Sequence, residues 1–391
     1  MMCPLIDSSG VRDVGAVVPK SEDDTPPMNE SRSNNPRGAL RLSIAALLLV
    51  CFVFCVAAQT PSSLEPGPKP RDVSSDWKQL VGIYADEDRN SKHSFVLLED
   101  GGKLYWREDT GQTWPFPITD GMVFPPNEAG RKVPGHDIIR DDAGNVIAFS
   151  YLNSGYIRTD PGKDPSHAFR IKPSQPVDTL RQEALAASPP VEKGPFRKPE
   201  LVELTTLDPT IHLDIRYATT NDFLGTPVYT QARAFLQRPA AEALVRALHK
   251  LEPLGYGLLI HDAYRPWYVT KIFWDATPPE GKIFVADPSE GSRHNRGCAA
   301  DLTLYDLATG TPIEMPGTYD EMSPRSFPDY PGGTSLERWH RDLLRRAMES
   351  EGFTVYEHEW WHFDYKDWRE YPILNIKFED LHSGQGLASA Q

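Results

Sequence analysis

The sequence predicts an α+β domain with an antiparallel sheet in its C-terminal half, preceded by a small all-β domain. Two sequence patterns support this prediction. After about residue 200, an apolar stripe at helical spacing follows some segments, while short strand-like runs separate them. Between residues 76 and 172, short aliphatic and aromatic runs are instead separated by turns rich in Gly, Asp and Asn, which is typical of antiparallel strands.

Stretches rich in proline divide the chain further. Residues 59–75 are rich in Pro and Ser, and residues 173–199 hold six prolines around a possible helix over residues 177–187. We therefore expect five parts: a leader over 1–58, a linker over 59–75, a small antiparallel β domain over 76–172, a Pro-rich linker over 173–199, and the α+β domain over 200–391.

The α+β domain opens with two expected strands, over residues 201–204 and 211–217. Arg238 and Pro239 then start a helix with one apolar face, because proline suits the first helical turn. A strand over residues 256–261 follows, with a charged residue directly after it.

A second helix begins at the capping box Thr334–Glu337 and ends at Gly352. His340 lies on its apolar stripe, so we expect this side chain to be packed in the core. The order of helices and strands predicts a sheet that carries the functional site on one face.

Composition excludes some partners. The chain has 391 residues, a formal net charge of −14 and a pI near 5.3. Phosphate backbones are bound by basic surfaces, which this composition lacks, so no nucleic-acid partner is expected. The oligomeric state is not determined by the sequence.

The leader is expected to carry an export signal. Apart from Ser43, the run from Leu42 to Ala58 is apolar; Arg37 and Arg41 precede it, and small residues lie at its end. This pattern favours a signal peptide cleaved after Ala58, and hence an exported protein, periplasmic or extracellular. The alternative is membrane anchoring through the uncleaved segment Leu42–Ala58. Because the polar stretch before it is long, translation from Met28 is a further hypothesis.

Three of the four cysteines lie in or before this segment, so the mature chain keeps only Cys298. No internal disulfide is then expected, even in an oxidising compartment. The alanines around Cys298 predict a small buried residue in place of a ligand or nucleophile.

Two separated stretches carry the chemistry. Residues 292–301 contain His294 and Asp301, and residues 359–362 contain Glu359 and His362. Two histidines and one aspartate leave a tetrahedral zinc with one open position, which is the ligand count of a catalytic site. A spare glutamate is then free to act as a base.

The local pattern predicts how these groups meet. Alternation over residues 299–305 places Asp301 on one strand face, pointing into a cleft, and Gly291 and Gly297 permit a loop that brings His294 back over the strand. Glu359 and His362 are three residues apart, so both reach the site only if a turn or bulge lies at residues 360–361. The spacing matches no simple zinc-finger or His-Glu-x-x-His pattern.

The motifs resemble those of a known family. The pattern Ser-x-His-x-x-Gly-x-Ala-x-Asp, followed by Glu-x-x-Trp-His, resembles the signature of the zinc-dependent D-alanyl-D-alanine dipeptidases, the vancomycin-resistance type. These share a fold with the D,D-carboxypeptidases and the hedgehog signalling domain. The resemblance covers roughly residues 198–380. The residues that carry it are Ser292, His294, Gly297, Ala299, Asp301, Glu359, Trp361 and His362, with matching segments at 216–220, 262–266 and 319–323.

The resemblance implies a hedgehog/D,D-peptidase-like domain with one Zn²⁺ held by His294, Asp301 and His362. Glu359 would act as general base and pass the proton of water to the leaving amine. In this family an arginine of the matching motif is catalytic, which implies that Arg265 stabilises the oxyanion. The alternative for Arg265 is a structural ion pair with Asp262.

Other residues are expected to bind substrate. Asp320 matches the family's residue for the free amino group, and a carboxylate is a suitable partner for an ammonium group. Ser292, Tyr217 and Tyr264 are candidates to donate hydrogen bonds to the substrate. Trp360 and Trp361 are expected as pocket walls, and His358 as a less favoured proton carrier.

The expected function is therefore zinc-dependent hydrolysis of the small dipeptide D-alanyl-D-alanine. Outside the cytoplasm, recycling of cell-wall dipeptide suits the enzyme better than a resistance role. The alternatives are a D,D-carboxypeptidase or related cell-wall peptidase, and a zinc-containing wall-binding module without activity. Asp320 argues against the first, and Glu359 with Arg265 against the second.

Overall fold

The computed structural model describes residues 63–88, 91, 93–116, 138–151, 154–160 and 169–381. The expected leader with its apolar run lies outside these residues, as do three of the cysteines. Among the helices of the described part, none is long and apolar enough to cross a membrane. Residues 61–391 form one compact unit.

The N-terminal part of this unit is an antiparallel sheet of seven strands, in the order β4-β3-β2-β1-β7-β6-β5, which follows the short helix α2 (Ser75–Leu80) in the sequence. Its apolar cluster, which includes Trp77, Tyr84 and Phe95, is distinct from the larger cluster formed after residue 176. Both nevertheless belong to one compact unit, so the separate all-β domain over 76–172 is not confirmed and stays a prediction. The strands are β1 (Gly82–Asp86), β2 (Ser94–Asp100), β3 (Lys103–Glu108), β4 (Thr113–Pro115), β5 (Ile138–Arg140), β6 (Val146–Tyr151) and β7 (Ser154–Arg158).

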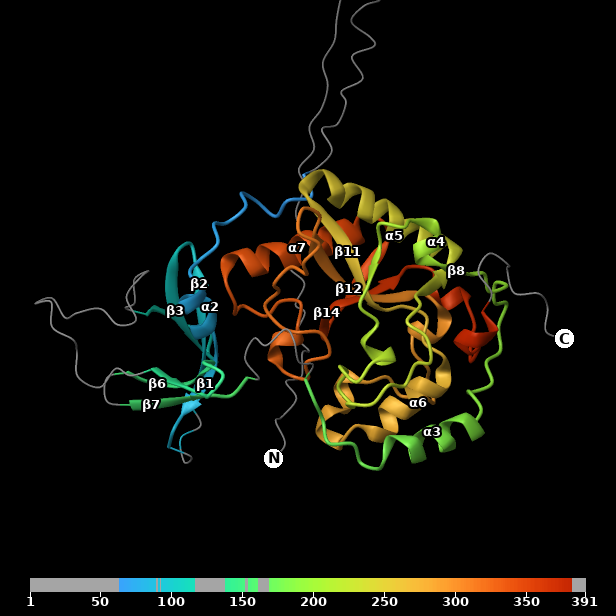
Figure 1. The fold of residues 1–391 in the computed structure, drawn as a ribbon, viewed down its shortest axis with the longest axis horizontal. Helices are drawn as coiled ribbons and strands as arrows, with labels where there is room; N and C mark the ends of the chain where they lie inside the picture. Colours follow the sequence, from blue (N-terminus) through green and yellow to red (C-terminus); the bar gives the residue numbers. More distant parts are fainter. Residues whose placement is uncertain are drawn as a thin grey trace, which may run out of the picture. The chain divides into compact units, whose positions relative to one another are not determined.

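The C-terminal part is built around a sheet of five strands in the order β13-β14-β12-β11-β9 (Figure 1). All its pairings are antiparallel except that of β9 with β11. This confirms the mixed α and β composition and the antiparallel sheet. The strands are β9 (His212–Leu213), β11 (Tyr256–Asp262), β12 (Ala299–Asp306), β13 (Phe353–Tyr356) and β14 (Glu359–Tyr365).

Helices α5 (Arg238–Leu251) and α7 (Ser335–Glu349) contact the strands of this sheet. Proline in the first turn of α5 and the capping box of α7, with Thr334 as N-cap, are present as predicted. Helix α3 (Val177–Ala186) packs on α6 (Trp267–Ala276), so the Pro-rich stretch before residue 200 also contributes to the core.

Two expected strands are shorter than predicted. Strand β8 (Leu201–Glu203) pairs with β10 (Phe235–Gln237), and the chain then turns into the short helix α4 (Leu204–Leu207). Only His212 and Leu213 of the expected strand over 211–217 pair with a neighbour. The 3₁₀ turn that follows carries the buried side chain of Tyr217. The 3₁₀ turns are Arg216–Ala218, Glu252–Leu254, Pro279–Phe284, His294–Arg296, Pro324–Ser326, Trp368–Glu370 and Phe378–Asp380.

Candidate active site

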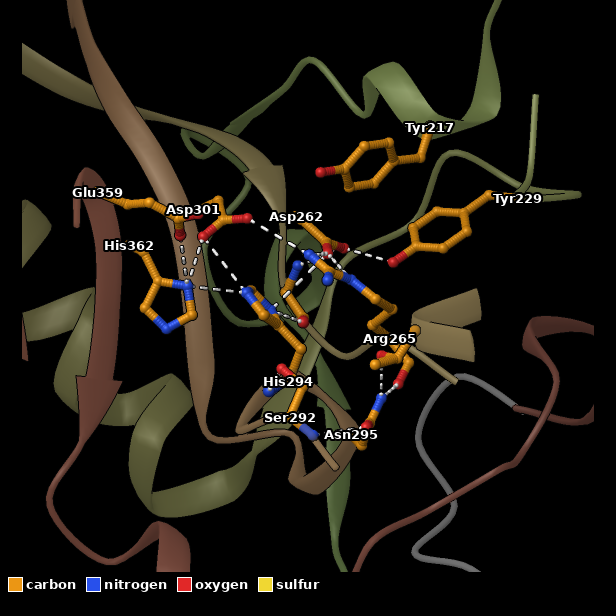
Figure 2. A network of polar contacts seen from close by, with 12 residues as sticks. Tyr217, Tyr229, Asp262, Arg265, Ser292, His294, Asn295, Asp301, Glu359 and His362 are labelled. Carbon is orange, nitrogen blue, oxygen red and sulfur yellow. Dashed lines mark hydrogen bonds and ion pairs between the residues drawn. The ribbon is translucent and has the colours of Figure 1, made fainter. Parts of the chain in front are cut away.

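Three buried side chains converge beside the five-stranded sheet (Figure 2). His294 Nε2 lies 3.1 Å from His362 Nδ1, and these two nitrogens lie 3.3 and 3.0 Å from Asp301 Oδ1. The expectation that two imidazoles and one carboxylate meet is thus fulfilled in the geometry. This group could hold a metal ion.

The sheet register explains the meeting. Asp301 on β12 pairs directly with His362 on β14, so both side chains point to the same face. Gly297, with a φ of 66°, ends the 3₁₀ turn that begins at His294 and returns the chain to β12, as the glycine spacing predicted. The backbone N–H of His294 donates to Ser292 Oγ at 3.2 Å, which holds this turn in place.

Each imidazole also has a hydrogen-bond acceptor on the side that faces away from the cluster. His294 Nδ1 lies 2.6 Å from the carbonyl oxygen of Ala263, and His362 Nε2 lies 2.9 Å from Asp364 Oδ1. Because these acceptors can take the ring N–H groups, the opposite nitrogens are able to present lone pairs to a cation bound in the cluster. Sequence reasoning missed Asp364, although a carboxylate behind a ligating histidine is a common arrangement.

The donor set fits a metal ion. Ligand atoms of a tetrahedral zinc, at its usual bond lengths, are separated by about 3.3 Å, close to the distances found here. Asp301 Oδ1 is buried and has no hydrogen-bond partner among the described residues. Burial favours protonation of Asp301, but His294 and His362 outweigh it and hold its pKa well below the usual value. Burial acts to lower the pKa of His362, yet Asp364 and Asp301 raise it to about 10. The surroundings therefore favour a positive charge at this position.

Glu359 lies beside the cluster, with its Oε2 3.6 Å from His362 Nδ1. The predicted irregularity of β14 brings it there: Val355 pairs with Phe363 but Tyr356 with Glu359, so residues 360–362 are extra on β14. Burial, together with the charge of Asp301 and against that of His362, raises the pKa of Glu359 to about 7. A carboxyl with such a pKa can accept and release a proton near neutrality.

Arg265 faces the same cavity and also makes the ion pair considered as its alternative role. Its guanidinium contacts Asp262 Oδ2 at 2.8 Å and lies 3.6 Å from Asp301 Oδ2. Asp262 is held in turn by the hydroxyl of Tyr229, which donates to Oδ1 at 2.7 Å. The ion pair therefore orients the cation toward the cluster, and the two roles are compatible.

Asp320 lies in the cavity wall with one oxygen engaged and one available. Tyr217 donates its hydroxyl to Asp320 Oδ1 at 2.9 Å, while Oδ2 is buried without a hydrogen-bond partner in the described part of the chain. Burial and the nearby charge of Asp301 raise the pKa of Asp320 well above the usual value. A cationic group at Oδ2 would reverse this cost, because it favours the ionised carboxylate.

The other expected contacts are only partly brought together. Ser292 lines the cavity, but Tyr264 does not: its hydroxyl is buried against the backbone of Ile376, donating to the carbonyl at 2.9 Å. The expected substrate contact of Tyr264 is thus corrected by packing that a motif cannot reveal. Trp361 lines the cavity, whereas Trp360 lies outside its lining.

Tyr319 and Asn295 are further residues that sequence reasoning missed. Tyr319 donates its hydroxyl to Asp301 Oδ2 at 3.2 Å, and Asn295 Nδ2 donates to the carbonyl of Arg265 at 2.8 Å. Both lie inside the matching motifs, and their closeness in the sequence to the predicted site residues was the signal that could have identified them. Together these side chains fit the class of hydrolases that activate water for attack on a carbonyl group.

Comparison with known proteins identifies the family. The model of the M15 peptidases, described as "D-ala-D-ala dipeptidase", matches residues 197–381. The D-alanyl-D-alanine dipeptidase of Escherichia coli is 35% identical over 179 residues, which cover 46% of this chain and 91% of that protein. The enzyme of the same name from Enterococcus faecalis is 36% identical over 196 residues, covering 44% and 95%. This chain belongs to the D-alanyl-D-alanine dipeptidase family and is an enzyme.

Proposed function

We propose that the chain hydrolyses D-alanyl-D-alanine with one Zn²⁺ held by His294, Asp301 and His362. The observation that carries this proposal is the convergence of three buried ligand atoms within 3.3 Å, with Glu359 beside them. The family membership and the names of the relatives support the dipeptide as substrate.

The chemistry follows from the positions of the side chains. A bound Zn²⁺ supplies a Lewis acid, which polarises the scissile carbonyl and lowers the pKa of water to about 7. Glu359 accepts a proton from the attacking water and delivers it to the nitrogen of the leaving D-alanine. Arg265, held by Asp262, stabilises the negative charge that develops on the carbonyl oxygen.

Asp320 selects a substrate with an unblocked amino group. Asp320 lines the cavity, and its Oδ2 has no hydrogen-bond partner among the described residues, so an ammonium group there would satisfy a buried acceptor. Tyr217 contributes by holding Oδ1. An N-acylated dipeptide lacks the charge and leaves Asp320 without a partner, which argues against a carboxypeptidase role.

The test compares D-alanyl-D-alanine, L-alanyl-L-alanine and N-acetyl-D-alanyl-D-alanine as substrates of residues 59–391, with and without chelator. We expect turnover of the first substrate alone, lost with chelator and restored by Zn²⁺. Equal turnover of the acetylated substrate would favour a D,D-carboxypeptidase. No turnover of any substrate by the zinc-loaded protein would favour a binding module.

We also propose that the protein is exported by residues 42–58 and recycles cell-wall dipeptide outside the cytoplasm. The apolar run with its basic flank supports this localisation. N-terminal sequencing of the native protein tests it: a start at Gln59 supports cleavage, and an intact segment in the membrane fraction supports anchoring. A cytoplasmic protein that retains the segment contradicts both.

A further inference from the structure

The segment that carries Asp320 is held from outside by the N-terminal sheet region. Asp160, just after β7, contacts Arg325 with 2.8 Å between Oδ1 and Nη1. Glu99 at the end of β2 accepts a hydrogen bond of 2.7 Å from the backbone N–H of Ser335, at the start of α7. These two contacts lie on either side of residues 326–334, shortly after Asp320 in the sequence.

The contact with Asp160 is the more deeply buried one. The side chains of Asp160 and Arg325 are 0% and 2% exposed. Asp160 is itself fixed to the sheet, because Arg158 Nε donates to its Oδ1 at 2.9 Å and the backbone N–H of Ile83 donates to its Oδ2. Burial acts to raise the pKa of Asp160, but Arg158 and Arg325 outweigh it and hold the pKa below the usual value, so the carboxylate is ionised.

Arg325 connects Asp160 to the loop beside the cavity. Its Nε lies 3.3 Å from Glu321 Oε1, and Glu321 Oε2 accepts a hydrogen bond of 3.1 Å from the backbone N–H of Thr318. Asp320 lies between these partners, with a φ of 61°, a left-handed conformation that non-glycine residues adopt rarely. Such a conformation persists where the surroundings impose it.

We propose that Asp160 is a positioning residue for recognition of the substrate's amino group. It anchors Arg325, which holds Glu321, and thereby keeps the Asp320 carboxylate directed into the cavity. This inference rests on the proposed function of Asp320. The match to the family begins at residue 197, so this chain uses a part outside the family region to set the specificity of its active site.

The experiment measures binding to the full chain, loaded with Zn²⁺ and carrying Glu359→Gln so that substrate is not consumed. Calorimetry compares D-alanyl-D-alanine with propionyl-D-alanine, which lacks only the amino group. The ratio of their dissociation constants reports recognition of the amino group. Asp320→Asn defines the ratio without this recognition, and Asp142→Asn, at an exposed turn of the same sheet, is the matched control.

We expect Asp160→Asn to reduce the preference for the free amine about tenfold, the size of one charge-assisted hydrogen bond, with unchanged zinc content. Asp142→Asn should retain the preference. Where Asp160→Asn does not fold, Asp160→Glu and Arg325→Lys keep the charges but change the reach, and a smaller loss of preference is expected.

Two results separate the inference from the function on which it rests. If Asp320→Asn abolishes the preference while folded Asp160 and Arg325 variants retain it, or weaken both ligands equally, the positioning role is wrong. If Asp320→Asn itself leaves the preference unchanged, the proposed role of Asp320 is wrong, whatever Asp160 does.

Discussion

Asp364 supports the site from the side of His362 that faces away from the cluster. Its Oδ1 lies 2.9 Å from His362 Nε2 and its Oδ2 lies 3.3 Å from Arg293 Nε, so each carboxylate oxygen has a partner. Such a partner fixes the ring orientation and raises the basicity of the nitrogen that faces the metal.

We therefore expect Asp364→Asn to weaken zinc affinity by about 10- to 100-fold. Competition with a chromophoric chelator measures this change. Asp367→Asn, three residues further on and paired with Arg197, is the control and should keep the parent affinity. An Asp364→Asn protein with parent affinity would show that Asp364 does not act through His362.

The substitution Glu359→Gln tests whether Glu359 is a general base or a metal ligand. Because the amide keeps the size of the side chain but cannot accept the proton of water, kcat should fall by about 10²–10⁴-fold while zinc content is retained. Steady-state kinetics and metal analysis of the same preparation measure both quantities. Loss of zinc together with activity would make Glu359 a ligand and contradict its proposed role.

At the level of elements, the irregular register of β14 is the feature that assembles the site. A regular strand would place Glu359 and His362 on opposite faces, and the extra residues 360–362 remove this conflict. The need for an irregularity could be recognised in the sequence, because Glu359 and His362 are an odd number of residues apart and a regular strand would separate them. The length of the bulge could not, because it depends on how β13 pairs with β14.

Helix α7 has a buried histidine that makes stability depend on pH. His340 is 6% exposed and its Nε2 lies 3.0 Å from the hydroxyl of Tyr256. Burial, and then the charge of Lys69, lower the pKa of His340 to about 4, against the opposing charges of Asp72 and Glu314. This confirms the expectation of a packed residue in place of a ligand.

The sign of the effect follows from the two states. Above about pH 6.5, His340 is neutral in both states. Between about pH 6.5 and 4, the unfolded chain binds a proton that the folded chain does not. As the pH is lowered through this range, the free energy of unfolding therefore decreases by up to about 1.4 kcal/mol per pH unit. His340→Gln should reduce this slope in urea titrations, and His212→Gln, at an exposed site, should not. An unchanged slope in His340→Gln would contradict the lowered pKa.

At the level of the whole molecule, zinc binding should stabilise the fold, because the ligands come from separated segments that meet only in the folded chain. At a free zinc concentration about 1,000 times the dissociation constant, the gain is about 4 kcal/mol. Thermal unfolding with and without chelator measures it, and Mg²⁺ as an added control ion should not restore the melting temperature. Equal melting temperatures and full activity after exhaustive chelation would contradict a resident metal.

The N-terminal sheet shows where sequence reasoning stops at this scale. Its strands β1, β2, β3, β6 and β7 could be recognised from local composition, since hairpins depend on short-range signals, whereas the three-residue strands β4 and β5 could not. Its contacts through Asp160 and Glu99 join residues more than 160 positions apart, and nothing near either residue indicates a partner.

The sequence by itself determined the mixed α and β composition and the helix capped at Thr334, because a cap depends on neighbouring residues. The roles of the His, Asp, Glu and Arg side chains of the site were predicted through the resemblance of separated motifs to a known family. Only the tertiary structure decided that Asp364 supports His362, that Tyr264 lies away from the cavity, and that Tyr217 serves Asp320. These outcomes depend on strand register and on the packing of distant segments, which fix where a side chain points once the chain has folded.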